Sequence, residues 1–221
     1  MVLCTCTIEE GIPPFVRSGA WLTAEYAMLP GSVSVGRKSR DDLKRDGRSV
    51  EIQRLIGRSL RAAVNLLNMP EVTLTVDCDV IQADGGTRTA AISGGWVALV
   101  DALGVLAARS GIGEQGSKSN QGLPAFPPGW LAGQVAAVSV GIAGGEVVCD
   151  LDYQADRNAD VDMNVVTLNG AYVEIQGTGE KGVFSRQQLD ALLEAAEGGI
   201  AVISGAQIDA FRLDCGTPAG S

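Results

Sequence analysis

The residues best suited to chemistry lie where a predicted strand gives way to a predicted helix. Apolar residues alternate along residues 71–81, Gly85 and Gly86 follow, and a helix-period run extends from Arg88 to about residue 109. The unpaired N–H groups at the start of a helix, together with the helix dipole, favour an anion. The guanidinium of Arg88 is a planar fork that fits phosphate oxygens. The segment therefore predicts a phosphate pocket, although it matches neither the Walker pattern nor the dinucleotide pattern of glycines.

A cluster of aspartates forms the second chemically active segment. It lies between an apolar strand and a predicted hairpin, and its members are Asp150, Asp152, Asp156, Asp160 and Asp162. Crowded carboxylates repel one another, and a divalent cation with oxygen ligands relieves that repulsion. The segment is therefore a candidate metal site. A solvated acidic loop explains the same residues, because no fixed spacing identifies magnesium sites.

The absence of histidine restricts the reaction class. The sequence contains none, which excludes Ser-His-Asp and Cys-His nucleophiles and nearly all catalytic zinc sites. Catalysis must then rely on carboxylates, arginines, backbone dipoles and hard metal ions. Phosphoryl chemistry suits this set, because it needs positioning and charge neutralisation more than a protein nucleophile.

Basic residues are concentrated in one part of an otherwise acidic chain. The net charge is −9, and the chain has 17 lysines and arginines. The cluster within residues 37–61 consists of Arg37, Lys38, Arg40, Lys44, Arg45, Arg48, Arg54, Arg58 and Arg61. Such a cluster is a candidate surface for a polyanion, and a solvated loop and helix face is the alternative interpretation.

Hydrophobic periodicity predicts the elements that position these residues. Strands are expected at residues 1–8, 21–29, 71–81, 134–142, 146–152, 163–168 and 171–177. Helices are expected at residues 49–68 and 88–109, and after a cap at Ser185, with Gly198-Gly199 interrupting the last one. Asn169-Gly170 is a strong hairpin signal. Because neither a repeat nor an internal linker is visible, we predict one α+β domain of mixed β-sheets packed with helices over residues 1–213. We expect a disordered tail at residues 214–221.

Cysteine usage and the absence of targeting segments indicate the compartment. Five cysteines without a CxxC pair indicate reduced thiols, and Cys78 and Cys149 are expected to be buried in strands. No signal peptide is visible at the start. The most apolar stretch, residues 130–148, is interrupted by glycines and polar residues, which favours strands over a membrane helix. We therefore expect a cytoplasmic protein without a membrane segment.

Together these features resemble the ribonuclease PH family, which is related to polynucleotide phosphorylase and to the exosome ring subunits. The matching runs, in family order across residues 2–200, include residues 21–30, 47–58, 77–89, 136–142, 149–153, 162–166 and 174–178. The resemblance implies a ribonuclease PH-like fold of the ribosomal protein S5 domain 2 type. It also implies a nucleotidyltransferase in which inorganic phosphate attacks the last phosphodiester of RNA. That reaction releases nucleoside diphosphates and trims the 3′ ends of tRNA precursors, as part of tRNA and rRNA processing.

The resemblance also assigns roles to residues. Those it implies for phosphate binding are Arg48, Gly86, Thr87 and Arg88. Those it implies for catalysis are Arg88, Asp156 and Asp162, the two aspartates also holding magnesium. Those that fall where family members contact RNA are Arg37, Arg40, Lys44 and Arg45. Family members form dimers that assemble into a hexameric ring, which implies a homo-oligomer here.

Several departures from the family pattern motivate a rival hypothesis. Family members carry a few dozen residues before the strand at which this sequence starts. Ala155 stands where an acidic residue is usual, the loop at residues 31–40 differs, and residues 116–130 form a longer segment. The rival is a catalytically inactive or impaired RNA-binding ring subunit.

Overall fold

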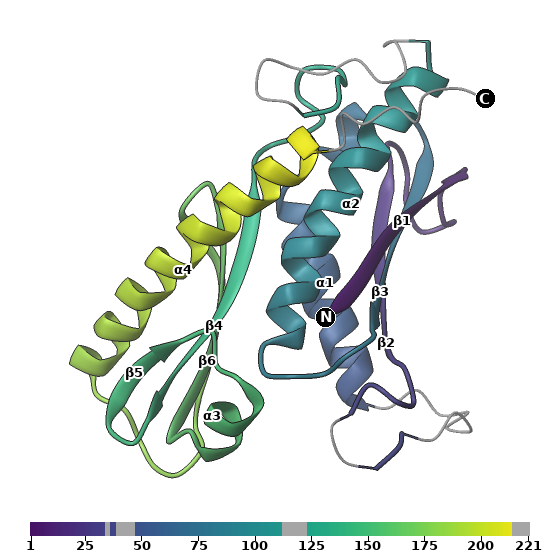
Figure 1. The fold of residues 1–221 in the computed structure, drawn as a ribbon. Coiled ribbons are helices and arrows are strands. Elements are labelled where there is room, and N and C mark those ends of the chain that lie inside the picture. The colour runs from purple at the N-terminus through teal and green to yellow at the C-terminus, as the bar shows by residue number, and fades with distance from the viewer. Residues whose placement is uncertain (34–35, 39–46, 112–122, 214–221) are drawn as a thin grey trace.

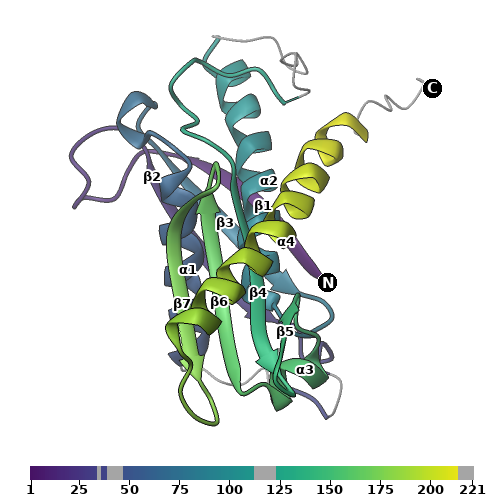
Figure 2. The ribbon, with the colours of Figure 1, turned by 90° about the vertical axis from the view of Figure 1, so that its left-hand side faces the viewer.

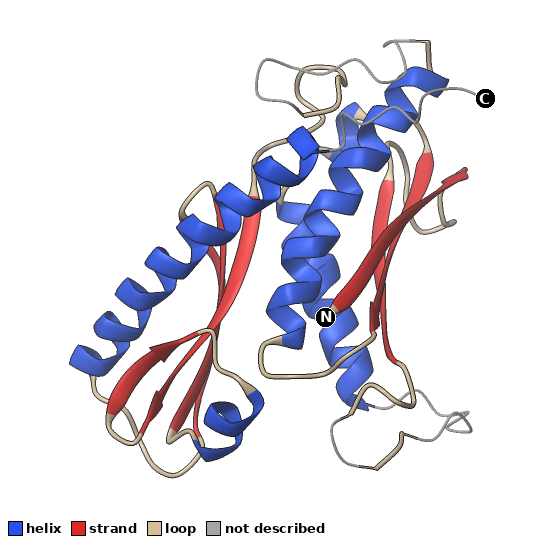
Figure 3. Ribbon diagram, viewed as in Figure 1, coloured by secondary structure: helices blue, strands red, loops and turns tan. Residues whose placement is uncertain are grey.

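The described part of the chain combines one mixed and one antiparallel β-sheet with four α-helices, which confirms the α+β prediction. The computed structural model describes residues 1–33, 36–38, 47–111 and 123–213. The first half contains β1 (Val2–Glu10), β2 (Trp21–Met28), α1 (Gly47–Ala62), the short 3-10 helix η1 (Leu66–Asn68), β3 (Val72–Val80) and α2 (Thr87–Arg109). The second half contains β4 (Val135–Ala143), β5 (Glu146–Cys149), α3 (Tyr153–Asn158), β6 (Val161–Leu168), β7 (Ala171–Gly179) and α4 (Arg186–Leu213). Figures 1 and 3 show the two sheets with α1 and α2 between them.

The first sheet has the order β1-β3-β2, with β3 at its centre. β3 is antiparallel to β1 and parallel to β2. Leu74 and Val76 of β3 are fully buried, because the alternation of β3 directs its apolar side chains onto α1 and α2. The parallel arrangement places the end of β2 beside the end of β3, close to the start of α2. That corner of the molecule holds the predicted phosphate pocket.

The second sheet has the order β5-β4-β6-β7, and all of its strands are antiparallel. β4 is buried at almost every position, because α2 packs on one face of it and α4 on the other. This double cover explains why its sequence is continuously apolar rather than alternating. Figure 2 shows α4 lying across the sheet. Asn169 and Gly170 both have positive φ, as a tight hairpin turn requires, so the predicted β6–β7 hairpin is confirmed.

Two predictions for the helices were wrong. The helix expected to extend to residue 68 ends at Ala62, after which the chain forms η1. Gly198-Gly199 does not interrupt α4, which is continuous over 28 residues. Gly199 instead lets the helix approach the sheet, because a Cβ there would lie 2.6 Å from Cys149 Sγ and 3.2 Å from Val138. Tertiary packing therefore outweighs the weak helix propensity of glycine at this position.

The acidic segment also differs from the prediction. It contains a helix that periodicity did not indicate, α3, whose N-cap Asp152 accepts a hydrogen bond of 2.7 Å from the backbone N–H of Ala155. β6 starts at Val161, which places Asp162 within a strand. Cys78 is buried as expected, whereas Cys149 is exposed because β5 is the edge strand of its sheet. The predicted cap at Ser185 is confirmed, since its hydroxyl accepts the N–H of Gln188.

In the described part of the chain, two helices are long and apolar enough to cross a membrane by length and composition alone. They are residues Thr87–Arg109 and Arg186–Arg212. The first is mostly buried between the two sheets, and core helices of this kind commonly meet the same criterion. The predicted tail at residues 214–221 and residues 116–122 of the longer segment lie outside the described residues. The single-domain boundary at residue 213 remains a prediction.

Candidate active site

The glycine turn before α2 is pressed against the start of the acidic segment. Gly86 is the N-cap of α2 and has a φ of +67°, a conformation that favours glycine. A Cβ on Gly85 would overlap the backbone carbonyl of Leu151, so the two backbones touch. The turn therefore does two things: it exposes the N-terminus of α2, and it brings that N-terminus beside the aspartates.

Asp84 fixes this contact between the turn and α3. Its Oδ1 accepts hydrogen bonds from the backbone N–H of Tyr153 at 2.6 Å and of Gly85 at 2.9 Å. Both bonds lower the pKa of Asp84, and the bond from Tyr153 has the larger effect. Asp84 was not among the predicted site residues. The signal was available, because an aspartate before two glycines commonly accepts hydrogen bonds from its own turn.

Tyr26 of β2 orients the first residue of α2. Its hydroxyl donates a hydrogen bond of 3.0 Å to Thr87 Oγ1, and the tyrosine is only 5% exposed. Burial raises the pKa of Tyr26, while the Thr87 bond and the nearby charges of Arg48 and Arg88 oppose that rise. Tyr26 lies in one of the runs that resemble the family, but nothing local to it indicated this contact with a residue far along the chain.

Four of the predicted site residues line one pocket of about 370 Å³. Arg48 comes from α1, Arg88 from the first turn of α2, Asp156 from α3 and Asp162 from β6. Four other residues complete the described lining: Arg157, Ala159, Glu180 and Lys181. The structure thus brings together residues that are separated by more than a hundred positions in the sequence.

An adjoining pocket of about 500 Å³ shares Arg48 and Asp156 with the first. Its lining also includes Tyr26, Thr87 and the predicted RNA-binding residue Arg37. Lys38 lines it as well, and the sequence analysis had placed that residue only in the general basic cluster. Three other predicted RNA-binding residues lie outside the described residues: Arg40, Lys44 and Arg45.

The carboxyl of Asp162 interacts with charged side chains of both signs in the smaller pocket. Burial raises its pKa, and so do the negative charges of Asp156 and Glu180. The positive charges of Arg88 and Arg48 oppose this rise. A carboxylate held close to a second carboxylate is stabilised by a hard divalent cation, so the pair fits magnesium chemically.

Four of the five aspartates of the acidic segment make different contacts. Asp152 caps α3, and Asp160 Oδ1 lies 4.0 Å from Lys181 Nζ. Asp156 and Asp162 line the pocket. No group of three or more His, Cys, Asp or Glu side chains able to hold a metal occurs among the described residues. A magnesium ion at the pair would therefore need its remaining ligands from water or substrate oxygens.

The basic cluster likewise divides into separate functions. Arg58 of α1 forms a two-point ion pair with Glu174 of β7, with distances of 2.6 and 2.5 Å. Arg61 lies 5.5 Å from the ring centre of Trp21 and donates to the Leu22 carbonyl. These two arginines contribute to packing, while Arg48 and Arg37 face the pockets.

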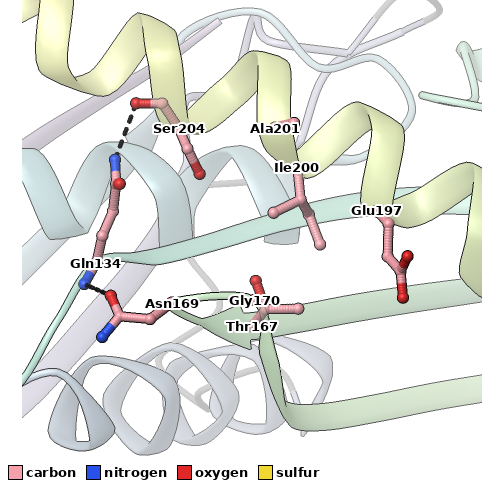
Figure 4. A pocket seen from close by; sticks show the side chains of 8 residues that line it. All are labelled: Gln134, Thr167, Asn169, Gly170, Glu197, Ile200, Ala201 and Ser204. Carbon is pink, nitrogen blue, oxygen red and sulfur yellow. Dashed lines mark hydrogen bonds between the residues drawn. The ribbon is translucent and has the colours of Figure 1, made fainter.

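A third pocket lies between the β6–β7 turn and α4, and Figure 4 shows the side chains that line it. It has a volume of about 460 Å³ and is lined near the β6–β7 turn and α4. Gln134 joins these elements, since its Nε2 donates to the Ser204 carbonyl and its N–H to Asn169 Oδ1, both at 2.9 Å. The described residues that line it include no arginine or lysine, so it does not suit an anionic substrate.

The pocket combines arginines, a helix N-terminus and a pair of carboxylates, a set of groups suited to phosphate esters. Comparison with known proteins agrees with that chemistry. The chain belongs to the 3′ exoribonuclease family: domain 1 of the family matches residues 1–103, and domain 2 matches residues 133–199. It is 50% identical over 216 residues to ribonuclease PH of Synechococcus sp. (strain JA-2-3B'a(2-13)). That alignment covers 96% of this chain and 84% of the relative.

Solved structures share the same fold. The crystal structure of rice (Oryza sativa) Rrp46 matches with a TM-score of 0.67 and 18% identity, covering 95% of this chain and 83% of that one. A chain of the archaeal exosome core matches with a TM-score of 0.63 and 17% identity, covering 93% and 75%. At these identities the likeness shows the fold alone. It confirms the ribonuclease PH-like architecture implied by the sequence.

Proposed function

We propose that this protein is a phosphate-dependent 3′-to-5′ exoribonuclease that trims the 3′ ends of tRNA precursors and releases nucleoside diphosphates. Membership of the 3′ exoribonuclease family and the 50% identity to a ribonuclease PH support this activity, which makes the protein a nucleotidyltransferase. The observation that carries the proposal is the single pocket that collects Arg48, Arg88, Asp156 and Asp162.

In this reaction inorganic phosphate is the nucleophile, so the protein must bring two anions together. We assign the attacking phosphate to the N-terminus of α2, where Thr87, Arg88 and the Gly86 turn lie, with Arg48 on the other side. A phosphate oxygen attacks the phosphorus of the terminal phosphodiester, and the 3′ oxygen of the preceding nucleotide leaves. The arginines lower the barrier by offsetting the charge that both reactants carry.

Magnesium is assigned to Asp156 and Asp162. The support is chemical: two neighbouring carboxylates in one pocket, one of them with a raised pKa, are an oxygen donor pair that a hard cation stabilises. When bound, the ion would neutralise charge on phosphoryl oxygens. The aspartates must be ionised to hold it, and Arg48 and Arg88 favour that state of Asp162.

RNA is assigned to the larger pocket and to the basic residues that follow Lys38 in the sequence. Arg37 and Lys38 line this pocket, and Arg40, Lys44 and Arg45 follow in the sequence. We further propose assembly of dimers into a hexameric ring and a cytoplasmic location. The structural likeness to rice Rrp46 and to the archaeal exosome core, together with family membership, supports the ring assembly.

The rival hypothesis of an inactive subunit is not favoured. It depends in part on Ala155, a position where the resemblance to the family implies an acidic residue. Ala155 lies in the first turn of α3, where its backbone N–H bonds to Asp152, and the pair Asp156 and Asp162 lines the pocket without it.

The test is an assay with tRNA carrying extra 3′ nucleotides, magnesium and radiolabelled inorganic phosphate. We expect shortened RNA and label in the β-phosphate of the released nucleoside diphosphates. Release of nucleoside monophosphates, or equal degradation without phosphate, would contradict the proposal. RNA binding without turnover would favour the inactive subunit instead.

A further inference from the structure

Cys4 and Cys78 lie directly opposite each other in the antiparallel pair of β1 and β3. Along these two strands, hydrogen-bonded residue pairs alternate with non-hydrogen-bonded pairs. The backbone hydrogen bonds from Ile81 N–H to the Met1 carbonyl and from Gly11 N–H to the Glu71 carbonyl show which pairs are hydrogen-bonded. Odd-numbered residues of β1 form the hydrogen-bonded pairs, so Cys4 and Cys78 form a non-hydrogen-bonded pair. In such pairs the Cα atoms are about 4.5 Å apart, which falls within the range of disulfides.

The two sulfur atoms are already in contact. Their Sγ atoms are 3.7 Å apart, and both thiols lie within reach of the Ala91 carbonyl on α2, Cys78 at 3.6 Å and Cys4 at 3.8 Å. Gly94 of α2 leaves room for the Cys4 side chain, since a Cβ there would lie 2.9 Å from Cys4 Sγ. Forming a disulfide would shorten this Sγ–Sγ distance from 3.7 Å to about 2.05 Å.

The surroundings of the two thiols are unequal. Cys78 is 1% exposed, whereas Cys4 lines a groove of about 490 Å³ between β1 and α2. The hydrogen bond with Cys78 lowers the pKa of Cys4, while that contact and burial raise the pKa of Cys78. Burial raises the pKa of the neighbouring Cys6 to about 12. The reactive thiolate of this strand is therefore Cys4, and Cys78 is placed to resolve its oxidised form.

We propose that Cys4 and Cys78 form a reversible dithiol–disulfide site that a peroxide oxidises. The Cys4 thiolate attacks a peroxide oxygen, the O–O bond breaks, and Cys4 becomes a sulfenic acid. The other oxygen leaves as hydroxide or alkoxide and takes up the proton that Cys4 lost on ionisation, which gives water or alcohol. The Cys78 sulfur then forms the S–S bond, and the sulfenic oxygen leaves as water with the Cys78 proton. Two thiols are oxidised and one peroxide is reduced. A dithiol reductant reverses the reaction by exchange.

The modification would join an edge strand covalently to the centre of the first sheet. It would also remove both thiol contacts from Ala91, which lies one helical turn after Thr87. The site is separate from the proposed phosphate pocket, because neither cysteine is among the described residues that line it. The inference therefore does not rest on the proposed activity.

The test is peptide mapping of the whole protein after hydrogen peroxide treatment. Trypsin releases residues 1–17 with Cys4 and Cys6, and residues 62–88 with Cys78 as the sole cysteine. We expect these two peptides to be linked, two hydrogens lighter than their sum, and released by dithiothreitol. Absence of this linked pair at a peroxide dose that oxidises the exposed Cys149 would overturn the proposal.

Matched variants identify the partners. Cys6→Ser should keep the link, because Cys6 faces Val76 and has no thiol opposite. Cys4→Ser should abolish it, and a link that persists in Cys4→Ser would overturn the assignment. Cys78→Ser should leave Cys4 as a sulfenic acid that dimedone captures. Capture at Cys6 instead of Cys4 would overturn the proposed order of steps.

Discussion

Replacing Tyr26 with phenylalanine removes one hydroxyl from beside the proposed phosphate site and leaves the ring in place. The lost interaction is the 3.0 Å hydrogen bond to Thr87 Oγ1, made by a side chain that is 5% exposed. Without it, the Thr87 hydroxyl can rotate away from the orientation in which we propose that it binds phosphate. A hydrogen bond of this kind contributes about 0.5–1.5 kcal/mol, which corresponds to a roughly two- to twelvefold weaker interaction with phosphate.

The measurement is the KM for inorganic phosphate at saturating RNA, for the native protein and for Tyr26→Phe. We expect the phosphate KM to rise by that factor while the Kd for RNA stays unchanged. Tyr172→Phe is the matched control, because it removes a 2.7 Å hydrogen bond to Glu197 at an exposed position on β7. An unchanged phosphate KM in Tyr26→Phe, or an equal rise in the control, would refute the assigned role of Tyr26.

Three further substitutions test the pocket. Arg88→Ala should abolish phosphate-dependent turnover and leave RNA binding largely intact, as measured by product release and by RNA titration. Asp162→Asn should abolish turnover yet raise the Tm at neutral pH without magnesium. Folding raises the pKa of Asp162, so the folded protein loses stability as the pH rises through that pKa and the carboxyl ionises. The amide of asparagine never ionises and avoids this loss. Lower Tm values for Asp162→Asn in the neutral range would contradict this. Gly85→Ala should lower the Tm because its methyl would overlap the Leu151 carbonyl, whereas Gly198→Ala in α4 meets no atom within 4 Å and should leave the Tm unchanged or higher.

The proposed phosphate half of the site could be predicted from local sequence. A strand, two glycines and a helix start are consecutive, so the proximity of Thr87 and Arg88 to a helix N-terminus needs no tertiary information. Arg48 and the aspartates Asp156 and Asp162 were different. No periodicity indicates that the start of α1 faces the start of α2, so Arg48 was assigned through family resemblance. The crowding of carboxylates indicated the acidic segment, and the resemblance singled out Asp156 and Asp162 within it.

What the sequence could not provide was the set of contacts that depend on packing. Tyr26 meets Thr87 only because β2 pairs in parallel with β3, so that its end lies beside the start of α2. Gly198-Gly199 was predicted to interrupt a helix because glycine is a poor helix former, but α4 needs Gly199 there to approach Cys149. In both cases the decisive partner is distant in sequence, and a propensity or a pattern contains no information about it.

The charge of the smaller pocket explains why arginines and carboxylates occur together in it. Its described lining has four basic side chains (Arg48, Arg88, Arg157 and Lys181) and three acidic ones (Asp156, Asp162 and Glu180). The resulting single positive charge is less than the negative charge that a phosphate dianion and a phosphodiester bring together. A pocket of arginines alone would compensate that charge but would hold the anionic product just as firmly. Carboxylates that recruit a divalent cation add positive charge that can leave again, which is the charge argument for magnesium in the proposed reaction.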